Sequence, residues 1–319
     1  MDYLDTDTAI DAAAPLEPAG TDGAFPGVIV DTKDLDTPIY TPVSLLCAAT
    51  PAPVVASCPH AGRDYPAPLT EAAVVTVDDM RGLEDFAMDQ LMGGLAAQGI
   101  TCLINRLARA YIDVNRPAGA LDAAMFDTPI DADKPSRQVA AGYGLIPRLS
   151  ANRQPLYSAA LPACEITRRL AVAYAPYHTM LAAQIAAAKA EHGHCLLVDV
   201  HSMPPRDRTN RKLADIVLGD CLGVTLDSHL TKPITDFFTE AGLSVAWNDP
   251  YAGGYITRTH GRIGTDEQSI QIEINRAIYM QNAAAPERTP HIDKTKAAAI
   301  SALLGRFGAF LIALKAPQA

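Results

Sequence analysis

The chain has 319 residues, with 26 Lys and Arg against 36 Asp and Glu, so its formal net charge is −10. This balance argues against nucleic acid or an anionic membrane surface as the partner, because both favour a basic protein surface. No run of about 18 apolar residues could span a membrane, and the first 32 residues contain no Lys or Arg that could begin a secretory signal. With 49% hydrophobic residues, we expect a globular protein of the cytoplasm with a sizeable core.

Residues 1–27 are rich in Asp, Ala, Pro and Gly without a clear period, which predicts an acidic N-terminal tail or strap. We expect the remainder, residues 28–319, to form one domain. Its predicted strands are residues 53–58, 99–104, 111–114, 195–201, 215–218, 243–247 and 269–275. Its predicted helices are residues 84–98, 161–191, 227–241 and 293–313.

Strands that alternate with helices along most of a chain indicate an α/β fold in which helices cover both faces of the sheet. Residues 117–160 interrupt this alternation, because they lose periodicity and gain Pro, Gly and Arg. The pattern predicts a long insertion beside the sheet, and long loops of this kind are often functional.

Ligands of such sheets gather where strands end, and two predicted strands of this chain end in a histidine. His60 follows the strand 53–58 in a tight turn, and His201 ends the strand 195–201. Neutral imidazole is a common zinc ligand. If the two strands are neighbours in the sheet, their histidines would form a metal site. His60 alone suits an ordinary loop histidine equally well.

Glu273 lies within a strand among Ile270, Ile272 and Ile274. A carboxylate in such a run is either paired with a cation or held there for a chemical task. Strand alternation allows Glu273 to face away from the isoleucines, and Arg276 is a possible ion-pair partner.

Five blocks together resemble the N-formylglutamate amidohydrolase family, in that family's order, over roughly residues 54–280. The blocks are residues 59–62 (PHAG), 111–117 (YIDVNRP), 198–202 (VDVHS), 253–258 (GGYITR) and 271–274 (QIEI). The resemblance implies a three-layer α/β/α sandwich with a mixed, mostly parallel sheet, similar to the zinc carboxypeptidases. It also implies hydrolysis of N-formyl-L-glutamate to formate and L-glutamate, a step of histidine degradation.

The resemblance further implies one Zn²⁺ per chain, bound by His60 and His201. The carboxypeptidase pattern has a glutamate three residues after the first histidine, and this chain has Arg63 there instead. The third protein ligand must then come from elsewhere. The family resemblance around residues 84–91 makes Asp85 the first choice, with Glu84 and Asp89 as alternatives.

The implied mechanism is metal-assisted amide hydrolysis. Glu273 matches the carboxylate that serves those peptidases as general base, and it would take a proton from the attacking water and pass it to the leaving amine. An arginine is needed for the oxyanion, and the candidates are Arg109 and Arg63. Either could instead be a surface charge.

Asn115 and Arg116 resemble the pair by which the carboxypeptidases hold a terminal carboxylate. A guanidinium suits this role because it binds a carboxylate through two parallel hydrogen bonds. The loop that begins at Gly253 would add Tyr255 and Arg258 to the site of a small anionic substrate.

The sequence therefore predicts a zinc hydrolase of an N-acyl amino acid, most readily N-formyl-L-glutamate. One alternative is a zinc exopeptidase or amidase that acts on another N-acyl or C-terminal amino acid. A second is a catalytically inactive relative that binds anions, which the arginine at position 63 favours.

Overall fold

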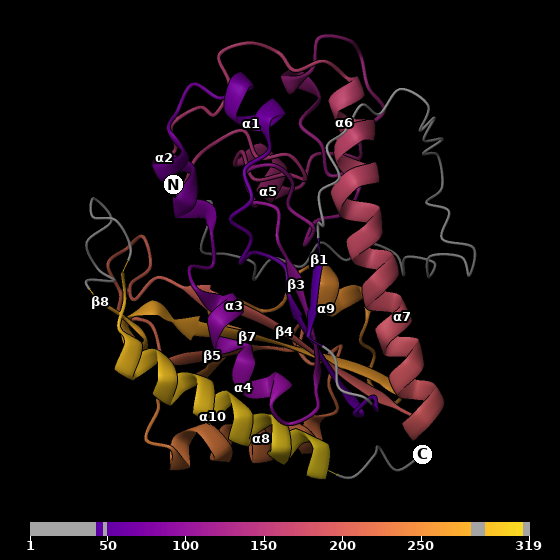
Figure 1. Cartoon of the computed structure of the whole chain (residues 1–319), viewed down its shortest axis with the longest axis vertical. Helices are drawn as coiled ribbons and strands as arrows, with labels where there is room; N and C mark the ends of the chain where they lie inside the picture. The colour runs from indigo at the N-terminus through magenta and orange to yellow at the C-terminus, as the bar shows by residue number, and fades with distance from the viewer. Residues whose placement is uncertain (1–42, 47–49, 282–290, 315–319) are drawn as a thin grey trace.

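The computed structural model describes residues 43–46, 50–281 and 291–314 (Figure 1). The predicted acidic tail, residues 1–27, lies outside the described residues. A central sheet organises the described chain. Its strands are β1 (Val43–Leu46), β2 (Val54–Cys58), β3 (Thr101–Asn105), β4 (Cys195–Met203), β5 (Ile216–Gly219), β6 (Val245–Trp247) and β7 (Glu267–Asn275).

The strand order in this seven-stranded sheet is β1-β3-β2-β4-β7-β5-β6. Strands β3, β2, β4 and β7 run parallel to one another, whereas β1 pairs antiparallel with β3 and β5 pairs antiparallel with β7. The predicted mixed, mostly parallel sheet is therefore confirmed. Strands β2 and β4 are neighbours, so His60, which follows β2, lies beside the end of β4, which carries His201.

Helices cover both faces of the sheet, as the alternation predicts (Figure 1). Helix α7 (Ala175–His192) packs on one face against β2, β3 and β4. The other face is covered by α3 (Met88–Leu91), α4 (Gly93–Ala96), α8 (Ser228–Glu240) and α10 (Lys294–Ala313).

The remaining elements are short. They are α1 (Ala67–Ala72), α2 (Val77–Met80), α5 (Arg137–Ala140), α6 (Cys164–Arg169), α9 (Tyr255–Thr259), the pair β8 (Met280–Gln281) and β9 (His291–Ile292), the 3-10 turns Arg81–Leu83, Ala123–Met125 and Arg276–Ile278, and the π-helical turn Leu170–Tyr174.

Strand alternation divides β4 and β7 into an apolar face and a polar face. Val198 and Val200 of β4, like Ile272 of β7, belong to the core that contacts α8 and α10. The alternate residues lie on the opposite face, which α7 covers. In β4 these are Asp199 and His201. The sheet thus carries a buried polar row on the face that α7 covers.

Residues 111–114 are not a strand, which corrects the sequence-based prediction. Their backbone bonds to turns and to the insertion: Tyr111 N–H donates to Ala108 O (2.8 Å) and Asp113 N–H donates to Leu145 O (2.8 Å). The run is apolar because residues of the 117–160 insertion pack around it in the α7-side core. A segment that is buried by loops can therefore have the same run of apolar residues as a buried strand.

The predicted helix 84–98 exists only in part, as the short helices α3 and α4. Residues 84–87 are not helical, because Asp85 N–H donates to His60 O (2.9 Å) and Ala87 has a left-handed backbone with φ of 60°. This departure from the helical pattern holds Asp85 beside the end of β2.

The predicted helix 161–191 begins at Cys164 and passes through α6 and the π-helical turn into α7. Pro176 lacks the N–H that would continue an α-helical ladder, so the turn before it widens. The helix ends as predicted at Gly193, where φ is 75° and N–H donates to Lys189 O (2.8 Å).

Helix α10 is long and apolar enough to cross a membrane, judged by length and composition alone. Leu304, Phe307 and Leu311 of this helix are buried in the core on one face of the sheet. A core position accounts for its apolar composition.

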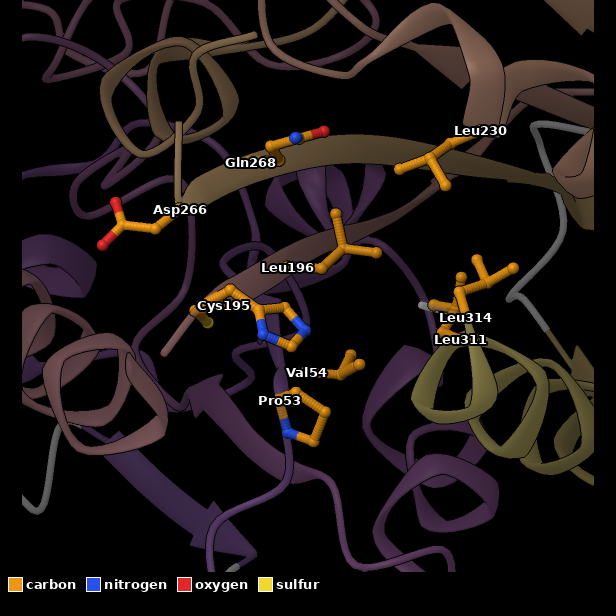
Figure 2. Close-up of a pocket in the computed structure, with 10 residues that line it drawn as sticks. Pro53, Val54, Cys195, Leu196, Leu230, Asp266, Gln268, Leu311 and Leu314 are labelled. Carbon is orange, nitrogen blue, oxygen red and sulfur yellow. The ribbon is translucent and has the colours of Figure 1, made fainter. Parts of the chain in front are cut away.

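An apolar pocket lies at the edge of the sheet where β2, β4 and β7 begin (Figure 2). Val54 and Leu196 line it from the strands, and Leu230 and Leu311 line it from α8 and α10. The predicted catalytic residues Glu273 and Arg109 lie toward the opposite, carboxyl ends of the strands and do not line this pocket.

Gly94 of α4 allows close packing on α10, because a Cβ at Gly94 would lie 1.7 Å from Ser301 O. We expect Gly94→Ala to lower the free energy of unfolding by about 1–3 kcal/mol, since the helices must separate. A Cβ at Gly93 would meet nothing within 4 Å, so Gly93→Ala should be neutral or stabilise by up to about 1 kcal/mol. Urea unfolding measures both variants, and equal midpoints would contradict this packing.

Candidate functional site

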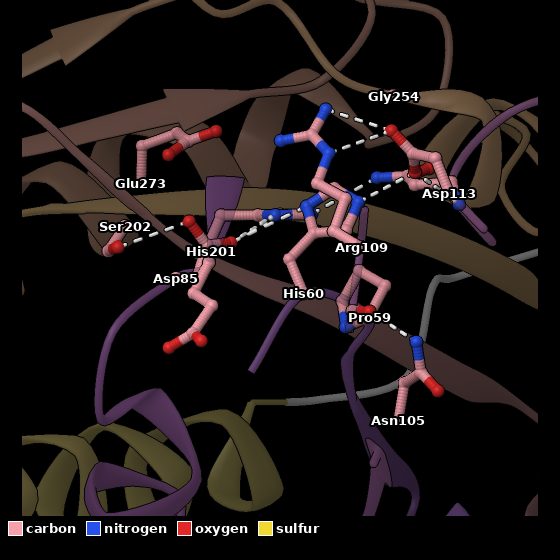
Figure 3. Close-up of polar contacts among 12 residues, drawn as sticks. Pro59, His60, Asp85, Asn105, Arg109, Asp113, His201, Ser202, Gly254 and Glu273 are labelled. Atoms are coloured by element: carbon pink, nitrogen blue, oxygen red, sulfur yellow. Dashed lines mark hydrogen bonds and ion pairs between the residues drawn. The ribbon is translucent and has the colours of Figure 1, made fainter. Parts of the chain in front are cut away.

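Three predicted ligands come together from distant parts of the chain (Figure 3). They are His60 after β2, Asp85 before α3, and His201 in β4, and all three are buried. Their ligand atoms lie within 4.8 Å of one another. Asp85 Oδ2 is 3.5 Å from His60 Nδ1 and 3.0 Å from His201 Nδ1.

A carboxylate lies behind each of the two imidazoles. His60 Nε2 is 2.7 Å from Asp113 Oδ1, and His201 Nε2 is 3.0 Å from Asp199 Oδ2. A carboxylate accepts the Nε2 proton, which leaves the Nδ1 lone pair of each ring for a metal and fixes the ring orientation. Two imidazole nitrogens and one carboxylate oxygen are a donor set that suits Zn²⁺.

The charges of the cluster favour a cation between the histidines. Burial acts to raise the pKa of Asp85, but its bonds to His201 and His60 outweigh that effect and hold the pKa well below its ordinary value. Burial likewise opposes ionisation of Asp113, and Arg109 and His60 hold the pKa of that carboxyl well below its ordinary value. Burial disfavours a charged His201, yet Asp199 and Asp85 raise the pKa of that imidazole well above its ordinary value. Positive charge is therefore stabilised at this position.

The sheet register places Glu273 beside this cluster. In the parallel pair β4 and β7, Glu273 lies opposite His201, and Gln271 lies opposite Asp199. Alternation puts all four side chains on the same face. Gln271 Nε2 donates to Glu273 Oε1 (3.0 Å), and Glu273 is buried.

Arg276, which the sequence offered as a partner of Glu273, contacts the Asp85 loop. Its Nε donates to Ser202 Oγ (3.1 Å), and its Nη2 donates to Glu84 O (2.6 Å). Ser202 Oγ in turn donates to Asp85 Oδ1 (3.1 Å). With Oδ1 bound in this way, the other carboxylate oxygen of Asp85, Oδ2, faces the histidines.

The two alternative third ligands have other partners. Glu84 Oε1 accepts a hydrogen bond from the Tyr65 hydroxyl (2.5 Å), and Asp89 forms an ion pair with Arg63. Neither carboxylate belongs to the cluster of His60, Asp85 and His201. The arginine at position 63 thus lies against Asp89, one of the carboxylates weighed as a ligand.

Two of the predicted arginines line the loop that follows β3. Arg109 contacts Asp113 Oδ2 through Nε (2.9 Å) and Nη2 (2.8 Å), directly behind His60. Arg116 Nε donates to Tyr143 O (3.1 Å), and Arg116 Nη1 donates to Asn115 O (3.1 Å).

Asn115 joins this loop to the first turn of α9. Its Nδ2 donates to Asp199 Oδ2 (3.2 Å), and its Oδ1 accepts from Ile256 N–H (2.8 Å). A Cβ at Gly254 would lie 2.6 Å from Asn115 Nδ2, so only glycine permits this approach. Asn115 is therefore held in the framework of the site.

Tyr255 and Arg258 both belong to α9. Tyr255 packs edge-on to His178, with ring centroids 5.8 Å apart. Arg258 is half-buried, and its side chain forms no hydrogen bond or ion pair with any residue that the structure describes. Its guanidinium is therefore available to an anion.

Asp113 and Asp199 lie within motifs quoted from the sequence, but sequence analysis assigned them no role. Asp199 could have been found, because it lies two residues before His201 in a buried strand and shares its face. Asp113 could not, since its position depends on a loop that the sequence pattern presented as a strand. His178 was also missed, and its Nε2 contacts Val114 O (2.9 Å) in this loop.

Comparisons with known proteins identify the family and the fold of the chain. Residues 52–280 match the model of a family described as N-formylglutamate amidohydrolase. A crystal structure of N-formylglutamate amidohydrolase from Ralstonia eutropha JMP134 is 31% identical, with a TM-score of 0.76, over 85% of this chain and 98% of that one.

An N-formylglutamate deformylase from Pseudomonas aeruginosa is 29% identical over 239 residues, which are 73% of this chain and 84% of that protein. A crystal structure of a gene product from Agrobacterium tumefaciens is 19% identical, with a TM-score of 0.64, over 85% of this chain and 94% of that one. At that identity the likeness concerns the fold alone.

His178 should make the fold sensitive to acid. Burial, together with the charge of His260, lowers the pKa of His178 to about 3, so the unfolded chain binds a proton below about pH 6.5 that the folded chain does not. This residue then lowers the free energy of unfolding by up to about 1.4 kcal/mol per pH unit as pH falls from about 6.5 toward 3.

His178→Gln keeps a donor for Val114 O and removes the titration, so its unfolding free energy should fall less steeply with acid. Urea unfolding at pH 7.5, 6 and 5 measures the difference. Exposed His229 supplies the matched control His229→Gln, whose pH profile should follow that of the unaltered protein. Parallel profiles for all three proteins would contradict the account.

Proposed function

The chain belongs to the N-formylglutamate amidohydrolase family, and we propose that it hydrolyses N-formyl-L-glutamate to formate and L-glutamate with one Zn²⁺ per chain. The observation that carries this proposal is the buried cluster of His60, Asp85 and His201 beside Glu273. The deformylase name of the Pseudomonas aeruginosa relative supports the substrate. That the enzyme acts in the cytoplasm stays a prediction.

His60, Asp85 and His201 would hold the metal. Asp113 and Asp199 would orient the two imidazoles, and Ser202 would orient Asp85. Zn²⁺ bound there would lower the pKa of a water molecule to about 7 and polarise the formyl carbonyl.

Glu273 would act as the general base and then as the general acid. Its position opposite His201 in the sheet puts a carboxylate next to the metal site, within a buried environment. It would take a proton from the attacking water and deliver it to the nitrogen of the leaving glutamate, so that formate and the amino acid separate.

Arg109 would stabilise the oxyanion that forms on the formyl oxygen. Its Nε and Nη2 are directed at Asp113, and its Nη1 has no hydrogen bond to the residues that the structure describes. The pair with Asp113 would fix the guanidinium before the reaction begins, and a fixed donor stabilises developing charge most effectively.

The substrate's two carboxylates would bind arginines. We propose Arg116, supported by Asn115, for one carboxylate and Arg258 with Tyr255 for the other. Arg63 would take part only if its ion pair with Asp89 opens. Local arginines of this kind attract a dianion even on a chain of net charge −10.

The direct test combines metal content with formate release. We expect the purified protein to hold about one zinc per chain and to release formate from N-formyl-L-glutamate until a chelator removes the metal. Zinc without formate release would exclude this substrate and favour another N-acyl or C-terminal amino acid. No metal and no activity after zinc is added would favour the anion-binding alternative.

Glu273→Gln tests the base in the same assay. The variant should retain zinc and lose about 10²- to 10⁴-fold in kcat, because the amide cannot accept the proton. Glu267→Gln, at the start of the same strand and paired with Lys189, should leave kcat near that of the unaltered enzyme. Near-normal turnover of Glu273→Gln would remove Glu273 as the base.

Asp85→Asn tests the third ligand against its neighbour Asp89. Loss of the charged oxygen should weaken zinc binding by at least about 100-fold, measured by competition with a chromophoric chelator. Asp89→Asn should change the zinc affinity less than about threefold, since Asp89 pairs with Arg63. The reverse ranking would assign the ligand to Asp89.

A further inference from the structure

Two buried tyrosines on one face of the long helix contact different parts of the site. Tyr174 ends the π-helical turn, and Tyr177 lies in the first turn of α7. Tyr174 is 1% exposed and Tyr177 is 0% exposed. A hydroxyl buried this deeply is costly unless it is hydrogen-bonded, so its contacts explain why tyrosine rather than phenylalanine stands there.

The Tyr177 hydroxyl begins a chain of hydrogen bonds that ends at the metal cluster. It lies 2.8 Å from Ser57 Oγ, and Ser57 Oγ donates to Asp199 Oδ1 (2.8 Å). Ser57 uses its one hydroxyl proton on the carboxylate, so Tyr177 is the donor to Ser57. The other carboxylate oxygen, Asp199 Oδ2, accepts from His201 Nε2 (3.0 Å).

The Tyr174 hydroxyl contacts the predicted substrate-binding residues instead. It donates to Arg116 O (2.9 Å), and burial together with the nearby Tyr255 phenol raises its pKa. This hydroxyl thus holds the loop of Arg116 against the long helix.

The two tyrosines lie where the π-helical turn passes into α7. A π turn has a wider hydrogen-bond ladder than an α-helix, and such turns occur frequently at functional sites. Here the wide turn precedes Pro176, and Tyr177 follows it in α7. Burial also raises the pKa of both phenols well above the ordinary value, which keeps them protonated as donors.

We propose that these two hydroxyls position the two halves of the active site. Tyr177 fixes the metal ligand His201 through Ser57 and Asp199. Tyr174 fixes the loop of Arg116, a proposed substrate-binding residue. Neither tyrosine touches the reacting atoms, so both are positioning residues, and the inference rests on the proposed function.

Tyr177→Phe and Tyr174→Phe form a matched pair, because each removes one buried hydroxyl from the same helix. Tyr177→Phe should weaken zinc binding about three- to tenfold, with the KM of the zinc-loaded enzyme changed less than twofold. Tyr174→Phe should raise the KM for N-formyl-L-glutamate about three- to tenfold, with kcat and zinc affinity changed less than twofold. Chelator competition and steady-state kinetics give these values.

A double-mutant cycle tests the chain through Ser57. Ser57→Ala should weaken zinc binding at least as much as Tyr177→Phe does, and Ser57→Thr should restore most of the affinity because it keeps the hydroxyl. Ser57→Ala combined with Tyr177→Phe should weaken zinc binding no further than Ser57→Ala alone, since both act through Asp199.

Several outcomes would overturn the proposal. Zinc affinity within twofold of the unaltered protein for Tyr177→Phe removes the role of Tyr177, and an unchanged KM for Tyr174→Phe removes that of Tyr174. Equal changes of both quantities in both variants would indicate general loosening of the helix. If the unaltered protein holds zinc but releases no formate, the proposed function fails, while the zinc affinity of Tyr177→Phe still decides the role of Tyr177.

Discussion

The structure depends on how buried negative charge is balanced where the central strands end. Asp85, Asp113 and Asp199 are all buried, and each faces a histidine. An unpaired buried carboxylate would cost several kcal/mol, so these groups are stable only with positive charge among them. Two imidazoles and Arg109 supply part of that charge. In the proposed function a divalent cation between the imidazoles would complete the balance, and the same cation would activate the water that hydrolyses the amide near neutral pH.

This balance also explains why the chain departs from regular structure near the site. The segment around Asp85 has a helical sequence pattern but is not helical, and it contacts the end of β2. The loop around Asp113 has a strand-like sequence pattern but is not a strand, and it contacts His60. Each loop is then secured from behind. Arg276 and Ser202 hold the first, and the insertion holds the second through Leu145 O. The scaffold thus fixes the donors before any metal or substrate binds, which lowers the reorganisation needed during the reaction.

The sequence revealed those parts of the site that local pattern encodes. A histidine that ends a buried apolar run, and a glutamate that alternates with isoleucines, both follow from strand periodicity, and the register of β4 and β7 places them opposite each other. The remaining parts depend on contacts between distant segments. The run at residues 111–114 is apolar because the insertion buries it, and the pairing of Arg63 with Asp89 has no local signal. The contact of Tyr177 with Ser57 likewise requires the packing of α7 on the sheet.

The central claim is that one metal ion is held by the Nδ1 atoms of both histidines and by Asp85. Crystals of the zinc-loaded protein, measured on both sides of the zinc absorption edge, test it most directly. The account predicts one anomalous peak per chain within about 2.0–2.2 Å of His60 Nδ1, His201 Nδ1 and an Asp85 oxygen, with Asp113 and Asp199 still bound to the Nε2 atoms. A peak on the Nε2 side of either ring, or one held by Glu84 or Asp89 in place of Asp85, would contradict it.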